Sequence, residues 1–182
     1  MENYYGGVLA LASVCLGALI TGLISILLHR LNKEKDLELS KRDEIKKYVD
    51  DILISAVEYF KSCDALLAAI DGVARDVDKK GKPYPDYKNF LNEHDRAYLI
   101  GKSNLQLCEA KLIMLMGVQS SASYHLMRYY RLFSDFRMGV FFNDGDEYLI
   151  PSISASIAKQ DELIAEKNLF VSTIGEYLKL HA

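Results

Sequence analysis

The chain has 182 residues, half of them hydrophobic, and its acidic residues outnumber its basic residues by 25 to 22. The resulting net charge of −3 argues against a nucleic-acid-binding surface, because such surfaces usually carry a basic stripe. After an apolar N-terminal segment, about 150 residues remain, which is enough for one domain with a single sizeable core.

Residues 8–28 contain no charged, Asn, Gln, Pro or His side chain. As a helix this segment reaches about 30 Å, the thickness of a bilayer hydrocarbon core, so we predict a single transmembrane helix. A cleaved signal peptide is one alternative, but no Lys or Arg precedes the apolar run. A buried core helix is the other, although a core helix is usually shorter and has a polar face.

The basic residues near this segment all lie on its C-terminal side: Arg30, Lys33, Lys35, Lys41, Arg42, Lys46 and Lys47. Because basic residues resist translocation, residues 1–7 are expected outside the cell membrane and the rest of the chain in the cytoplasm. Tyr4 and Tyr5 suit the headgroup level on the outer side. The three cysteines, Cys15, Cys63 and Cys108, have no pairing pattern and are expected to be reduced, buried thiols.

Small residues recur every four positions within the predicted span. They form two neighbouring lines, which together comprise Ser13, Gly17, Ala18, Thr21, Gly22 and Ser25. Small side chains let two helices approach closely in lipid, so we predict a helix–helix interface there. The alternative is that Gly, Ala and Ser are simply common in membrane spans.

Residues 29–44 are predicted to form a charged, solvated helical stalk, because no Gly or Pro lies between Leu23 and Asp71 to break a helix. From Ile45 the apolar residues become regular, with spacings of four and three. They are Ile45, Val49, Ile52, Ala56, Tyr59, Cys63, Leu66, Ile70, Val73 and Val77. This pattern predicts the first helix of a bundle, which ends in the Gly- and Pro-containing loop at residues 79–85.

Three further helices are predicted. The second runs from about Asp86 to Met116 and buries Leu91, Tyr98, Leu105 and Leu112, with Ala97, Cys108 and Leu115 beside them. The third follows a turn at Gly117 and buries Ala122, Leu126, Tyr129, Phe133, Phe136 and Val140. After a turn at residues 143–146, the fourth begins near Pro151 and buries Ile153, Ile157, Ile164, Val171, Ile174 and Leu178.

The predicted fold class is therefore all-α. It comprises an N-terminal transmembrane helix, a helical stalk and a cytoplasmic up-down antiparallel four-helix bundle over residues 45–182.

No catalytic signature is present. Glu-x-x-His pairs, HExxH, phosphate-binding glycine loops, GxSxG and CxxC are all absent from the sequence, so we predict no enzyme activity, no cofactor and no metal. The acidic run at residues 143–147 suits a solvated turn better than a cation site. His94, Asp95 and Arg96 are interpreted as an exposed helix face, and Cys108 as a core thiol rather than a nucleophile.

Aromatic and basic residues cluster in the third helix. Most of the aromatic residues belong to its buried stripe, whereas Tyr130, Arg131 and Arg137 lie off it, so we predict these three as a partner surface. The predicted function is a membrane-anchored, non-catalytic interaction, scaffold or regulatory module that binds the bilayer and either a protein partner or its own copies. The alternative is an oligomeric membrane effector in which the bundle gates assembly of a permeabilising pore. Neither a nucleic acid nor a small-molecule substrate is predicted.

Overall fold

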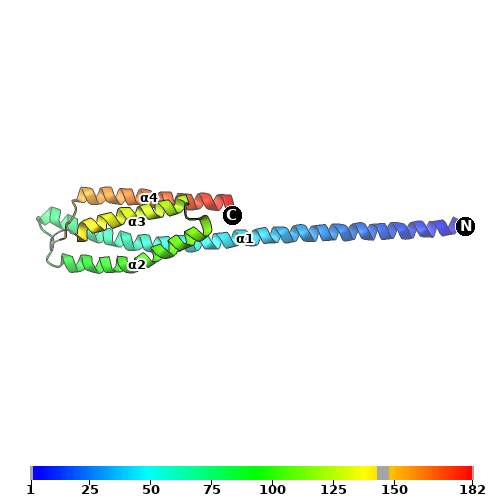
Figure 1. Cartoon of the computed structure of the whole chain (residues 1–182), viewed down its shortest axis with the longest axis horizontal. Coiled ribbons are helices and arrows are strands. Elements are labelled where there is room, and N and C mark those ends of the chain that lie inside the picture. Colours follow the sequence, from blue (N-terminus) through cyan, green and yellow to red (C-terminus); the bar gives the residue numbers. More distant parts are fainter. Residues whose placement is uncertain (1, 143–147, 182) are drawn as a thin grey trace. The chain divides into compact units, whose positions relative to one another are not determined.

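The computed structural model describes the backbone of residues 2–142 and 148–181, and side chains from Gly22 onward within these ranges. The described chain forms four α-helices and no strand: α1 (Glu2–Lys80), α2 (Tyr87–Met116), α3 (Ser121–Phe141) and α4 (Ile153–His181). Figure 1 shows these helices along the chain. The all-helical prediction is therefore confirmed, and the helices are consistent with a helical bundle.

The chain divides into two compact units, Met1–Glu44 and Ile45–Ala182, and helix α1 contributes to both. Among the described residues, no helix is long and apolar enough to cross a membrane. The predicted span at residues 8–28 is only partly included in that finding, since the side chains of residues 8–21 lie outside the described part of the chain. The side chains at residues 22–44 are all exposed.

The core of the second unit begins with the part of α1 that follows Ile45. Most side chains predicted there from the alternating spacing are buried, including Val49, Ile52, Tyr59, Leu66 and Ile70, while Ile45 and Val77 at the two ends are half-buried. Residues from α2, α3 and α4 complete the same hydrophobic core. Burial of these apolar stripes supplies most of the driving force for the helices, because helix propensity alone is weak.

The helix ends follow local sequence signals. Gly81 and Gly117 both have positive φ angles, of 71° and 86°, a conformation that glycine adopts without strain. The side chain of Ser120 accepts a hydrogen bond from the Ser123 amide and caps α3. Ser152 similarly accepts from the amide of Ala155 at 3.2 Å, so it rather than Pro151 marks the start of α4.

Consecutive helices of the second unit run in opposite directions (Figure 1). The contacts between α2 and α3 show that the two helices are antiparallel. Lys102 of α2 donates a hydrogen bond to Tyr130 of α3, whereas Asp95, which comes earlier in α2, accepts from Arg137, which comes later in α3. Between α1 and α2, the close approach is made at Gly101. A Cβ atom built there would overlap the side chain of Ser62, which explains a glycine in the middle of this helix.

The predicted buried face of α4 is partly wrong. Ile174 is buried as expected, but Ile157, Ile164 and Val171 are exposed. The buried positions are instead Ser156, Leu163, Glu166, Phe170 and Ile174. Aliphatic residues occupy two faces of this helix, so spacing alone did not identify the face that packs against the other helices.

Candidate functional site

The three residues of the predicted partner surface have different surroundings. Arg137 is largely buried: its Nη2 atom donates to Asp95 Oδ2 at 2.7 Å, and its Nε atom donates to Asp95 Oδ1. The guanidinium also lies 5.4 Å from the ring centroid of Tyr98. The hydrogen bonds with Asp95 raise the pKa of Arg137 above its ordinary value. The geometry therefore gives Arg137 an internal role in joining α2 to α3.

Tyr130 and Arg131 lie closer to the surface than Arg137. Lys102 Nζ donates to the hydroxyl of Tyr130 at 3.0 Å, which ties that ring to α2. Arg131 is exposed and lines a surface hollow of about 520 Å³ near the turn between α2 and α3. Of the three residues, Arg131 is the one most available to a partner, and the partner surface itself stays a prediction.

The interpretation of residues 94–96 as an exposed helix face is wrong for Asp95. Asp95 is buried, whereas His94 is half-buried and Arg96 is exposed. A carboxylate can be buried at this position because Arg137 supplies both opposite charge and two hydrogen bonds.

Two lines of exposed apolar side chains mark the outer surface of the bundle. On α2, Ile100, Leu107 and Met114 recur every seven residues, and we call this line the α2 stripe; its two ends are 76% and 78% exposed. On α4, Ile157, Ile164 and Val171 have the same spacing and form the α4 stripe. Residues seven apart share one helix face, so each stripe presents a continuous apolar line to the surroundings.

Sequence reasoning did not identify Glu166, a buried carboxylate that links α3 to α4. Its Oε2 atom lies 2.9 Å from His125 Nδ1, and its Oε1 atom forms an ion pair with Arg128 Nε at 3.0 Å. Its spacing could have identified it. Glu166 lies three residues after Leu163 and four before Phe170, so it shares the buried face of α4 with them. Arg128 compensates its charge and His125 contacts its second oxygen, so the cluster joins these helices.

Aromatic rings and a thiol form the centre of the core. Tyr59 lies 6.0 Å from Tyr129 and 6.4 Å from Tyr98, measured between ring centroids. The hydroxyls of Tyr59 and Tyr129 are buried without a hydrogen-bond partner among the described residues. Burial raises the pKa of both hydroxyls far above the ordinary tyrosine range, and Cys63 also contributes. These phenols therefore stay protonated.

Both described cysteines are free and buried, as predicted. Burial raises the pKa of the Cys63 thiol to about 12, and it raises that of Cys108 to the same value. The thiol of Cys108 donates to the carbonyl oxygen of Ile52 at 3.6 Å, so it is held in the interface of α1 and α2. Because the thiolate is the reactive form, these pKa values describe core thiols rather than nucleophiles.

Raising the pH above about 9 should destabilise the bundle. Unfolded cysteines ionise near their ordinary pKa of 9.0, whereas Cys63 and Cys108 stay protonated in the fold until about pH 12. The stability that these two thiols contribute is therefore fully present below pH 9. It is lost as the pH rises towards 12, by about 1.36 kcal/mol per pH unit for each thiol. Urea unfolding at several pH values from about 8 to 11 measures this slope. A Cys63→Ala, Cys108→Ala variant should show a shallower slope; equal slopes would contradict the assignment.

The remaining predicted site residues are mostly outside the described side chains. This holds for Ser13, Gly17, Ala18 and Thr21, while Gly22 and Ser25 are described and exposed. The acidic turn at residues 143–147 also lies outside the described residues. In the part of the chain that is described, no group of three or more His, Cys, Asp or Glu side chains is arranged to hold a metal ion.

Comparison of the chain with protein-family models, with curated proteins and with solved structures found no match.

Proposed function

We propose that the chain is a membrane-anchored, non-catalytic module whose cytoplasmic helical bundle binds a protein partner or further copies of itself. The observation that carries the interaction role is the α2 stripe. Ile100, Leu107 and Met114 present large apolar side chains on one face of a helix whose opposite face is in the core. Water-exposed apolar lines of this kind are typical of surfaces that become covered by another helix.

The anchoring role is supported by the apolar residues at the start of the described side chains. Leu23, Ile24, Ile26, Leu27 and Leu28 each expose more than half of their surface, and they continue the uncharged run that begins at residue 8. A bilayer would remove these side chains from water, and the basic residues after the run favour a cytoplasmic bundle. We therefore propose a single span at residues 8–28 with the N-terminus outside.

Photo-crosslinking of the full chain in its native membrane tests the interaction role. A photoreactive amino acid replaces Ile100 or Leu107, which are exposed, so the fold should tolerate either change. The expected result is a light-dependent adduct from both positions, with the captured protein identified by mass spectrometry. Leu169, an exposed residue of α4 outside the α4 stripe, provides the control position. Absence of adducts from both α2 positions would contradict the proposal.

The same experiment distinguishes the interaction role from the alternative, an oligomeric, pore-forming effector. The small residues of the predicted span favour this alternative, because they suit close packing of several spans in lipid. It requires adducts between copies of the chain and leakage of dye from vesicles that contain the full chain. Leakage should then be lost in a Gly17→Leu variant that still inserts. Adducts without leakage favour the scaffold role instead.

A further inference from the structure

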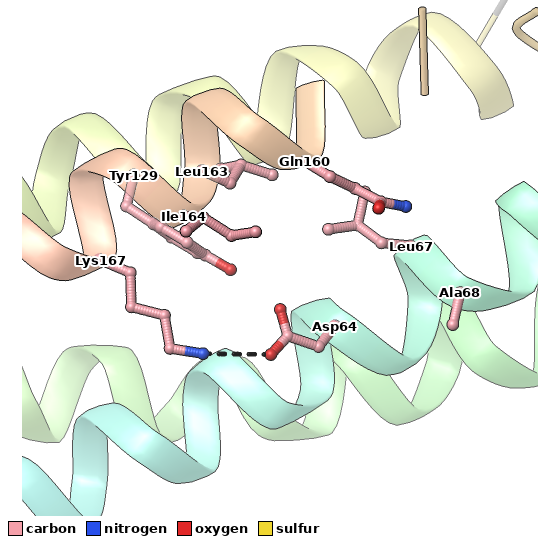
Figure 2. A pocket seen from close by; sticks show the side chains of 8 residues that line it. All are labelled: Asp64, Leu67, Ala68, Tyr129, Gln160, Leu163, Ile164 and Lys167. Carbon is pink, nitrogen blue, oxygen red and sulfur yellow. Dashed lines mark hydrogen bonds and ion pairs between the residues drawn. The ribbon is translucent and has the colours of Figure 1, made fainter. Parts of the chain in front are cut away.

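The exposed face of α2 differs in charge from the exposed surfaces of the other helices. Between Ala97 and Met114, no exposed residue is charged, and we call the exposed residues of this segment the uncharged face. By contrast, Lys167 of α4 and Asp64 of α1 form a surface ion pair at 3.2 Å, drawn in Figure 2. The exposed surface of α3 includes Arg131. Charged residues normally cover the solvent face of a helix, so their absence from α2 needs a reason.

The charged residues that this segment does contain are turned towards neighbouring helices. Lys102 Nζ donates to the Tyr130 hydroxyl of α3 at 3.0 Å. On the other side, Lys111 Nζ donates to the Asp51 carbonyl oxygen of α1 at 3.4 Å. Glu109 is half-buried and lines the hollow beside α3. The outward direction is thus left to uncharged side chains.

The uncharged face combines a central large side chain with small neighbours. Leu107 is the middle residue of the α2 stripe, seven positions from both Ile100 and Met114. Ser103, four residues before Leu107, and Ala110, three residues after it, are exposed on the same face. Small side chains on both sides of Leu107 leave space for one large side chain of a facing helix, as in knobs-into-holes packing. A second Leu107 fits that space.

The absence of charge favours a second copy of this chain over a different protein as the facing molecule. In a two-fold symmetric contact, residues near the axis meet their own counterparts. A charged residue there would face a like charge, which is unfavourable, whereas a different protein could present opposite charges. The uncharged face meets the stricter requirement of contact with itself.

We propose that the uncharged face of α2 forms a two-fold contact between two copies of this chain, centred on Leu107. The Leu107 side chain of each copy packs between Ser103 and Ala110 of the other. This inference rests on the proposed function, because a contact along one helix is smaller than a standard protein interface. Anchoring of both copies in one membrane raises their effective concentration and supports the contact.

Energy transfer between fluorescent proteins fused after Ala182 measures the contact, with the full chain in phosphatidylcholine vesicles. If both copies carry Leu107→Glu, or both carry Leu107→Lys, like charges meet at the axis, and association should weaken about tenfold or more. A mixture of Leu107→Glu donor chains and Leu107→Lys acceptor chains should recover association, because opposite charges then face each other. Leu169→Glu is the matched control, since Leu169 is 46% exposed and Leu107 is 48% exposed.

Thermal unfolding of each variant checks that the fold is retained, which the exposure of both positions favours. Unchanged association of the Leu107→Glu chains would overturn the proposal, because contacts elsewhere, including the predicted span, would then hold the copies together. Absence of recovery in the mixture, or an equal loss with Leu169→Glu, would also overturn it. If photo-crosslinking at Leu107 captures only a different protein, the interaction role stands and the contact between copies is wrong. Absence of any adduct contradicts both.

Discussion

Replacement of Phe133 by alanine is expected to lower the free energy of unfolding by about 3–5 kcal/mol. Phe133 is fully buried in α3, and its ring lies 4.8 Å from that of Tyr98, measured between centroids. The truncation removes apolar area from the core and leaves a cavity that close-packed helices cannot fully refill. Urea unfolding of the full chain in detergent, followed by circular dichroism, measures the change.

Ile164→Ala is the matched control for this prediction. Both residues were predicted to be buried, but Ile164 is 54% exposed on α4, so its truncation should cost less than about 1 kcal/mol. If the two variants lost stability equally, the burial assigned to α4 would be incorrect.

Replacement of Asp95 by alanine should be equally severe, with a loss of about 3–5 kcal/mol. The side chains of Asp95 and Arg137 are each 12% exposed, so the change leaves a guanidinium in the interior without its partner. Charge burial is unfavourable unless it is compensated, and Tyr98 offers only its ring face. The same urea unfolding experiment measures this loss.

A double-mutant cycle identifies the source of that loss. When Asp95→Leu and Arg137→Leu are combined, no charge remains buried, so the double variant should be more stable than the sum of the single losses predicts. Simple additivity would show that the two side chains do not interact and would contradict the ion pair.

The sequence predicted α1 well and α4 poorly for a physical reason. In α1 the apolar residues form one wide stripe, and charged residues such as Glu58 and Lys61 occupy the other side, so a single face can be buried. In α4, Leu163 and Phe170 compete with Ile164 and Val171 for the core. The face of α4 that becomes buried depends on the neighbouring helices, and a pattern within one helix contains no information about them.

The candidate sites were less accessible to sequence reasoning than the fold. Asp95 and Arg137 are 42 residues apart, and so are paired only when α2 and α3 pack together. The burial of the Tyr129 hydroxyl is likewise a property of how the helices pack, since no local signal distinguishes a tyrosine with a buried hydroxyl from one with an exposed hydroxyl. Helix ends could be predicted because Gly117 and Ser120 act through their own backbone neighbourhood.

The unpaired hydroxyl of Tyr59 bears on how this sequence was selected. Tyr59 is completely buried, and phenylalanine would fill the same space without the cost of removing a hydroxyl from water. A phenylalanine at this position would avoid that cost. Natural proteins stay just above the stability that they need, so mutation can retain such costs without loss of fitness. The core of this bundle thus contains a position, Tyr59, at which replacement by phenylalanine is expected to raise the free energy of unfolding.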